Sequence, residues 1–265
     1  MMQKRNLRCL ALLVVVLLLL SGCQQAPAPV QPSEPSLEQN SYDATCFSEQ
    51  DGFLTYDDGT RTASLGVDVS YYQKEIDWQA VRDAGITFAM IRVGYRGYSG
   101  GTIGLDERFT ENIAGALAAG LRVGVYFFSQ AVDEIEAEEE AQFVLAQIAD
   151  YDITMPVMFD WEDAAVEGAR TETVTAQTLT ACAEAFCRTI EAAGYTPGIY
   201  FSQHMGYQRV NLGKLQDAVF WLAEYNAVPT FFYRFEMWQY TDAGKIPGIE
   251  TAVDLNLWFE KKEVL

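Results

Sequence analysis

Histidine and cysteine are scarce in this sequence of 265 residues. His204 is the only histidine, so no second imidazole is available for a catalytic site built on histidine. The cysteines show no metal-ligand spacing, and Cys182 and Cys187 point in different directions on one expected helix. We therefore expect no bound metal, no cofactor and no disulfide between these two cysteines.

Positive charge is also scarce, because 18 lysines and arginines face 37 aspartates and glutamates. The formal net charge is −19, and it becomes −22 once the three basic residues near the N-terminus are removed with a leader peptide. Nucleic acids require basic patches on the proteins that bind them, so nucleic acid is excluded as a partner. The same charge disfavours electrostatic adhesion to anionic surfaces.

Only one long apolar run is present, and it lies between Leu10 and Leu20. Three basic residues precede it, and small residues follow it, which is typical of a secretory signal. The run is too short for a membrane span of roughly 20 residues. It ends in Leu20-Ser21-Gly22-Cys23, which resembles the lipobox of bacterial lipoproteins. An ordinary signal peptide with an incidental cysteine is the alternative.

That resemblance implies cleavage before Cys23 and attachment of a diacylglycerol to its sulfur. We expect residues 1–22 to be a signal peptide and the exported protein to sit on the outer face of the cytoplasmic membrane, facing the cell wall. Residues 23–63 are rich in Pro, Gln, Ser and Glu, which predicts a disordered tether. The remaining residues, 64–265, are enough for one domain with a substantial core.

Apolar runs and amphipathic stretches alternate from residue 65 onwards, which predicts a mostly parallel sheet buried on both faces. Eight strand candidates favour a closed (β/α) barrel of the TIM type, irregular in its second half because its last strands lack connecting helices. An open doubly wound sheet is the alternative, but no glycine-rich phosphate loop follows the first strand. The expected strands are 65–70, 86–95, 121–130, 155–162, 195–202, 218–225, 235–241 and 252–258, and the expected helices are 76–85, 106–120, 133–151 and 173–194.

Acidic residues recur at the expected strand ends. Asp68 lies in the first strand, Asp160 and Glu162 end the fourth, and Asp254 lies in the last. Two positions apart on a strand, Asp160 and Glu162 point to the same side, where their charges repel each other. A solvated polar strand end would explain one such pair. Acids from three distant segments at the edge where parallel α/β folds form their sites instead predict a catalytic cluster.

Aromatic residues accompany these acids. Most aromatic residues in strands belong to the core, but carboxylates with aromatic walls are what sugar binding and glycosidic cleavage require. The candidate sugar-binding residues are Tyr126, Trp161, Tyr200, Tyr225 and Trp238.

Several blocks of the sequence occur in the order found in one known family: GVDVSYYQKEIDW (66–78), ITFAMIRVGY (86–95), FTENIAGALAAGLRVGVYFF (109–128), PVMFDWE (156–162), WLAEY (221–225), WQYTDAGKIPGI (238–249) and VDLNLW (253–258). In these blocks the chain resembles the lysozymes of glycoside hydrolase family 25, which are N-acetylmuramidases that cut bacterial peptidoglycan. The resemblance covers nearly all of the expected domain, from Gly66 to about Phe259.

The resemblance implies an irregular, flattened β/α barrel with a site at Asp68, Asp160, Glu162 and Asp254, and Glu162 as the general acid. It further implies cleavage of the β-1,4 bond between N-acetylmuramic acid and N-acetylglucosamine, with peptidoglycan glycan strands as the partner of an enzyme that we expect to be monomeric. The family's usual Tyr-His-Tyr reads Tyr126-Phe127-Phe128 here.

Three mechanisms remain open for the second carboxylate. Positions two apart lie roughly 6.6 Å apart along a strand at about 3.3 Å per residue. That spacing lies between the carboxyl separations of retaining enzymes, about 5–5.5 Å, and inverting ones, about 6.5–9.5 Å. We favour attack by the substrate's own acetamido oxygen, oriented by Asp160, over attack by Asp160 itself. A catalytically inactive wall-binding lipoprotein and a chitinase-like N-acetylglucosaminidase are the alternative functions.

Overall fold

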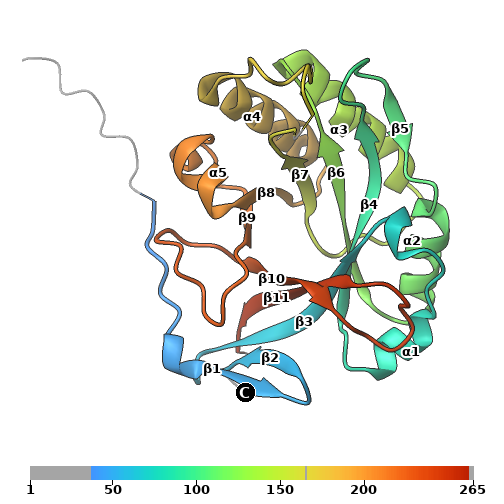
Figure 1. Ribbon diagram of the computed structural model, residues 1–265, viewed down its shortest axis with the longest axis vertical. Coiled ribbons are helices and arrows are strands. Elements are labelled where there is room, and N and C mark those ends of the chain that lie inside the picture. The colour runs from blue at the N-terminus through green and yellow to red at the C-terminus, as the bar shows by residue number, and fades with distance from the viewer. Residues whose placement is uncertain (1–36, 165, 263–265) are drawn as a thin grey trace, which may run out of the picture. The chain divides into compact units, whose positions relative to one another are not determined.

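The computed structural model describes residues 37–164 and 166–262, so the expected signal peptide and Cys23 lie outside the described residues (Figure 1). Eight strands close into a barrel in the order β3-β4-β6-β7-β8-β9-β10-β11, and β11 pairs with β3 to complete the ring. The predicted barrel is confirmed, and the open sheet is excluded. The barrel strands are β3 (Arg61–Val69), β4 (Phe88–Arg96), β6 (Arg122–Ser129), β7 (Val157–Trp161), β8 (Pro197–Ser202), β9 (Val219–Ala223), β10 (Met237–Gly244) and β11 (Val253–Lys261).

The second half of the barrel is irregular, as expected. The pairings from β3 through to β10 are parallel, whereas β11 runs antiparallel to both of its neighbours, β10 and β3. A short strand, β5 (Ile103–Leu105), extends the sheet beside the end of β4. In the part of the chain that the structure describes, no helix connects β9 to β10 or β10 to β11.

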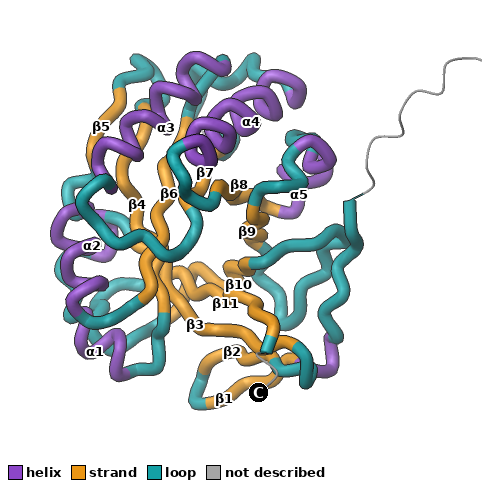
Figure 2. The backbone as a smooth tube through the Cα atoms, turned by 180° about the vertical axis from the view of Figure 1, so that it is seen from behind, coloured by secondary structure: helices purple, strands orange, loops and turns teal. Residues whose placement is uncertain are grey.

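Helices cover the outside of the other half (Figure 2). The four expected helices are present, together with a short one that was not expected. They are α1 (Trp78–Asp83), α2 (Phe109–Ala118), α3 (Glu134–Ile148), α4 (Ala176–Ala192) and the additional α5 (Gln203–Gln208), with short 3-10 turns at η1 (Ala44–Cys46), η2 (Tyr71–Gln73) and η3 (Leu212–Lys214). No helix among the described residues is long and apolar enough to cross a membrane.

Local sequence signals set the helix ends. Asp133 caps α3 by accepting a hydrogen bond from the backbone N–H of Glu136 at 2.9 Å, and Thr175 caps α4 by accepting one from Thr178 at 3.1 Å. Gly194 follows α4 with a φ of +88°, a conformation that favours glycine and ends the helix.

Large side chains fill the barrel interior below its mouth. They pack directly against glycines on neighbouring strands, where no side chain would fit. An added Cβ at Gly66 would lie 2.3 Å from the ring of Phe88, and one at Gly198 would lie 2.1 Å from the sulfur of Met158. These pairs fill the lower barrel with side chains. The interior cluster consists of Phe88, Met90, Tyr126, Met155, Met158, Trp221 and Met237.

The expected tether boundary at residue 63 is wrong, because residues 37–63 are folded. Strands β1 (Phe47–Gln50) and β2 (Phe53–Tyr56) form an antiparallel hairpin beside β3 (Figures 1 and 2). The ring of Phe47 lies 5.5 Å from that of Trp238, and Tyr42 stacks on Phe259 at 4.0 Å. This N-terminal hairpin therefore takes the place of the missing helices and buries the apolar outer face of β10 and β11.

Candidate active site

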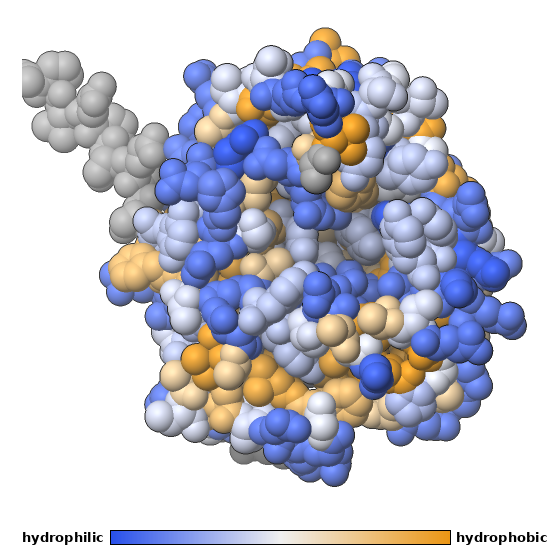
Figure 3. Space-filling view, viewed as in Figure 1, coloured by the Kyte–Doolittle hydropathy of each residue, from blue (hydrophilic) through white to orange (hydrophobic). Residues whose placement is uncertain are grey.

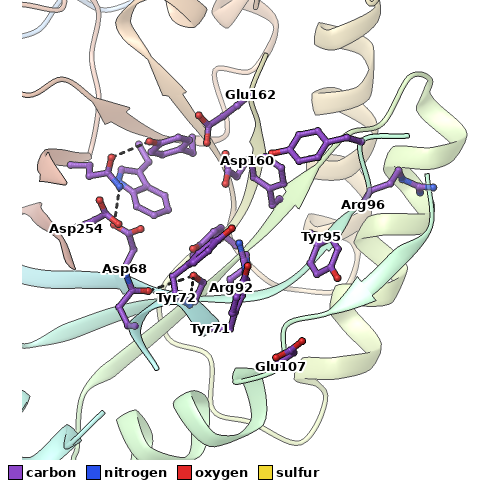
Figure 4. A pocket seen from close by; sticks show the side chains of 18 of the residues that line it. Asp68, Tyr71, Tyr72, Arg92, Tyr95, Arg96, Glu107, Asp160, Glu162 and Asp254 are labelled. Carbon is purple, nitrogen blue, oxygen red and sulfur yellow. Dashed lines mark hydrogen bonds between the residues drawn. The ribbon is translucent and has the colours of Figure 1, made fainter. Parts of the chain in front are cut away.

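The four predicted acids meet in one cavity of about 620 Å³ at the mouth of the barrel. Figure 4 shows Asp160 and Glu162 pointing into it from β7, with Asp68 and Asp254 beside each other. On the face shown in Figure 3, the surface is hollowed near its centre and hydrophilic side chains predominate around the hollow. The structure thus brings together acids that are up to 186 positions apart in the chain, from Asp68 to Asp254.

Asp254 reaches the mouth in a way that the sequence analysis did not anticipate. Because β11 is antiparallel to β3, the N-terminal end of β11 lies at the same edge as the carboxyl ends of β3 and β7. Asp254 is the direct cross-strand partner of Asp68. Their side chains therefore share one face of the sheet and face each other.

Strand alternation places Asp160 and Glu162 on the cavity side, as predicted. The Asp160 side chain is buried, with the residue only 5% exposed, and its Oδ1 atom has no hydrogen-bond partner among the described residues. Glu162 lies one step beyond the end of β7, exposed at the rim. One carboxyl group therefore lies deep in the cavity, and the other stands where a bound chain could reach it.

The environment raises the pKa of all four acids. Burial, followed by the charges of Glu162 and Asp68, raises the pKa of Asp160 well above its ordinary value, and Arg92 opposes this only in part. The cavity walls and the charge of Asp68 raise the pKa of Glu162. Burial raises the pKa of Asp68 to about 6, and burial together with the charge of Asp68 raises that of Asp254 to about 8. The cavity therefore holds protons near neutral pH, as general acid catalysis requires.

Three of the candidate sugar-binding residues, Tyr126, Tyr200 and Tyr225, line the cavity. The hydroxyl groups of Tyr200 and Tyr225 donate to Oε1 of Gln239 at 3.0 and 2.8 Å, and Nε2 of Gln239 donates to Asp68 at 2.9 Å. Gln239 was not recognised from the sequence. It connects the tyrosine wall to the acid cluster.

The structure places Trp161 and Trp238 in the core, so their predicted contact with sugars is wrong. Trp161 is 2% exposed and its indole N–H donates to the carbonyl of Ala131. Trp238 is fully buried and donates to the carbonyl of Glu224. The physical reason is alternation, because each tryptophan is next in sequence to a residue that faces the cavity and must itself face outwards.

Sequence reasoning also missed Arg92, whose guanidinium lines the cavity. Its central carbon lies 5.1, 5.5 and 5.9 Å from the ring centres of Tyr71, Tyr72 and Tyr95. It forms a salt bridge of 2.7 Å with Asp106, which neutralises its charge locally. A single arginine within the otherwise apolar start of β4 was the available signal.

The departure from Tyr-His-Tyr has different consequences at its two positions. Phe127 faces away from the cavity and is fully buried in the outer core. Phe128 lines the cavity together with Tyr98, and their ring centres are 5.8 Å apart. Within residues 37–164 and 166–262, no group of three or more His, Cys, Asp and Glu side chains is placed to hold a metal ion.

Comparisons with known proteins agree with this fold. The model of the family described as "Glycosyl hydrolases family 25" matches residues 67–249. Lysozyme M1 of Streptomyces globisporus is 26% identical over 203 residues, which make up 72% of this chain and 66% of that protein. The chain therefore spans just under two thirds of the length of this curated relative.

Solved structures share the fold. The autolysin LytC of Streptococcus pneumoniae, determined in complex with a synthetic peptidoglycan ligand, aligns with a TM-score of 0.67 at 22% identity, covering 80% of this chain and 52% of that one. A family 25 glycosyl hydrolase of Bacillus anthracis aligns with a TM-score of 0.63 at 22% identity, covering 77% of this chain and 91% of that one.

Proposed function

The chain belongs to glycosyl hydrolase family 25, and on this premise we propose that it is a peptidoglycan hydrolase, a lysozyme that cleaves the β-1,4 bond between N-acetylmuramic acid and N-acetylglucosamine. The observation that carries the proposal is the convergence of four acids with raised pKa values in one tyrosine-walled cavity. Paired carboxyl groups in different environments are the machinery of glycosidic cleavage.

Glu162 is the proposed general acid. Its position at the rim leaves its carboxyl group open to a glycan in the cleft, and no described side chain hydrogen-bonds to it. Its raised pKa favours the protonated form that can donate to the leaving oxygen.

Asp160 is the proposed partner of the substrate's acetamido group. Its buried Oδ1 lacks a partner within the described part of the chain, and an N–H group of a bound N-acetyl sugar would satisfy it. In the proposed step the acetamido oxygen attacks C1 while the bond from C1 to the leaving oxygen breaks, and Glu162 transfers its proton to that oxygen. Water then opens the cyclic intermediate and returns a proton to Glu162.

Product analysis tests this function. Purified peptidoglycan digested with the protein should gain new reducing ends that are N-acetylmuramic acid. New ends at N-acetylglucosamine would instead support the chitinase-like alternative. Retained binding to cell walls without any new reducing end would support the non-catalytic wall-binding alternative.

The N-terminal sequence supports a membrane-anchored location facing the cell wall. We infer that Cys23 carries lipid, with 13 residues between it and the first described residue, Leu37. Because residues 37–63 are folded, the connection from Cys23 to Leu37 can reach no further than about 50 Å at up to about 3.3–3.6 Å per residue. The catalytic domain would then act close to the membrane.

Cys23→Ser tests the anchor. The variant should leave the membrane fraction and appear as soluble protein, because no lipid can be attached at position 23. Fractionation and the mass of the N-terminal peptide measure this. Wild-type protein found free, with an unmodified Cys23 at its mature N-terminus, would contradict the anchor.

A further inference from the structure

An indole group determines the orientation of an amide beneath the cavity. The Nε1 atom of Trp221 lies 2.8 Å from Oδ1 of Asn256, and both residues are almost completely buried. An indole N–H only donates, so Asn256 must present its oxygen to Trp221. Its NH₂ group then faces Asp68, with Nδ2 at 2.8 Å from Oδ2 of that carboxyl.

The same oxygen of Asp68 accepts a second amide hydrogen. Nε2 of Gln239 lies 2.9 Å from Oδ2, while the Oε1 atom of Gln239 accepts from two tyrosine hydroxyls. A proton on Oδ2 would be directed against amide hydrogens on both sides. This oxygen of Asp68 is therefore an unprotonated acceptor.

Asp254 faces Asp68 across the antiparallel pair of β3 and β11, close enough for a hydrogen bond between the two carboxyl groups to influence the pKa of each. Such a bond needs one shared proton, because two carboxylates only accept. The pKa of Asp254 is raised to about 8 and that of Asp68 to about 6, which agrees with a proton on Asp254.

We propose that Asp254 holds the proton of this pair and that Trp221, through Asn256, keeps Asp68 as a fixed, buried anion that serves the general acid. The inference rests on the proposed function. The negative charge of Asp68 raises the pKa of Glu162, helps this general acid to retain its proton, and faces the positive charge that develops on the sugar during cleavage. Trp221 and Asn256 are then positioning residues of the reaction.

Other charged and titratable groups around the cavity are consistent with this role. Arg92 of β4 is paired with Asp106 and does not neutralise Asp68. Burial keeps three of the phenol groups that line the cavity neutral by raising their pKa, and Asp242 of β10 acts on Asp254 rather than on Glu162. The phenols are Tyr126 on β6, Tyr200 on β8 and Tyr225 after β9.

The pH dependence of turnover distinguishes the two possible proton positions. Asp68→Asn should move the alkaline limb of the rate profile to lower pH, because Glu162 loses a neighbouring negative charge. Asp254→Asn should lower the rate at least about tenfold less than Asp68→Asn does. It should also leave that limb in place, because its amide still donates to Asp68. If the proton were on Asp68, Asp254 would be the anion. Asp254→Asn rather than Asp68→Asn would then move the limb to lower pH, which would overturn the proposal.

Trp221→Phe tests the positioning role with a matched control. It removes the N–H but keeps an aromatic ring, and it should shift the alkaline limb in the same direction as Asp68→Asn, by a smaller amount. Trp238→Phe also removes a buried indole N–H, but that group donates to a backbone carbonyl outside the network and should leave the limb in place. Equal profiles for the two variants would refute the role of Trp221.

A measurement without substrate separates failure of this proposal from failure of the proposed function. Neutron diffraction from deuterated crystals of the unmutated protein at neutral pH should show a deuterium on the Asp254 carboxyl and none on Oδ2 of Asp68. It should also show the ND₂ group of Asn256 facing Asp68. A deuterium bound to Asp68 would overturn the proposal, whether or not the protein cleaves peptidoglycan.

Discussion

Glu162→Gln is expected to slow peptidoglycan cleavage by about 10²–10⁴-fold while the fold and glycan binding are retained. A glutamine has nearly the same shape as the glutamic acid but cannot transfer a proton to the leaving oxygen. Because the Glu162 carboxyl makes no hydrogen bond to another described side chain, its replacement breaks no interaction that stabilises the barrel. Release of reducing ends, with thermal unfolding as the check on folding, measures the effect.

The pH dependence of the cleavage rate provides a second test of Glu162 as the general acid. The pKa of Glu162 is raised, so the protonated, active form persists above the ordinary range of a glutamate, and the rate should fall as the pH rises through that pKa. The residual activity of Glu162→Gln should lack this limb.

A neighbouring acid provides the matched control. Asp163 is the next residue, and its carboxyl group forms a 2.9 Å salt bridge with Arg209. Asp163→Asn should therefore keep a rate within a few fold of the wild type. Loss of this surface salt bridge should cost about 1 kcal/mol or less in stability, so the fold should also be retained. A Glu162→Gln variant that digests cell walls at the wild-type rate would remove Glu162 from the role of acid.

Strand alternation allowed the proposed catalytic pair to be placed on one face from the sequence, and it would also have excluded two wrong assignments. Asp160 and Glu162 are two positions apart and share the cavity side. Trp161 lies between them, and Trp238 is adjacent to the cavity-facing Gln239, so both tryptophans had to point into the outer core. The aromatic character of the two tryptophans suggested sugar binding, but their positions in the strands direct them away from the cavity.

The direction of the last strand had a signal that was overlooked. Only residues 245–252 separate β10 from β11, and a parallel crossover connection needs about a dozen residues or more. The short connection favours an antiparallel return. This return is what brings Asp254 opposite Asp68.

Two features depend on contacts that no local pattern reveals. The overall composition of residues 23–63 is polar and so predicts a tether. It conceals the few aromatic residues, such as Tyr42 and Phe47, that cover a helix-free face of the barrel. Likewise, the hydrogen bond from Asn256 to Asp68 joins residues 188 positions apart. Both features exist only once the barrel has closed.

Asp160→Asn is expected to slow turnover by about 10²–10³-fold, the scale seen when one preorganised electrostatic contact is removed, without abolishing glycan binding. If the acetamido group is the nucleophile, the buried Oδ1 of Asp160 accepts its N–H and orients it. A thiazoline analogue of the cyclised sugar should then bind the wild type at least about 10²-fold more tightly than the substrate does, as a likeness of the intermediate. The Asp160→Asn variant should lose most of that gain, because the carboxylate that accepts the N–H is gone.

The competing mechanisms give different products. If Asp160 attacks C1 directly, a slow fluorinated substrate should leave a covalent sugar mass on the peptide that contains Phe159-Asp160-Trp161. If water attacks in a single displacement, the first product released should have the inverted anomeric configuration. The acetamido route predicts retention of configuration, no covalent mass and tight thiazoline binding together. An ester trapped on Asp160 would contradict it, because the deep position of that carboxyl would then serve attack on C1 rather than orientation of the substrate's own amide.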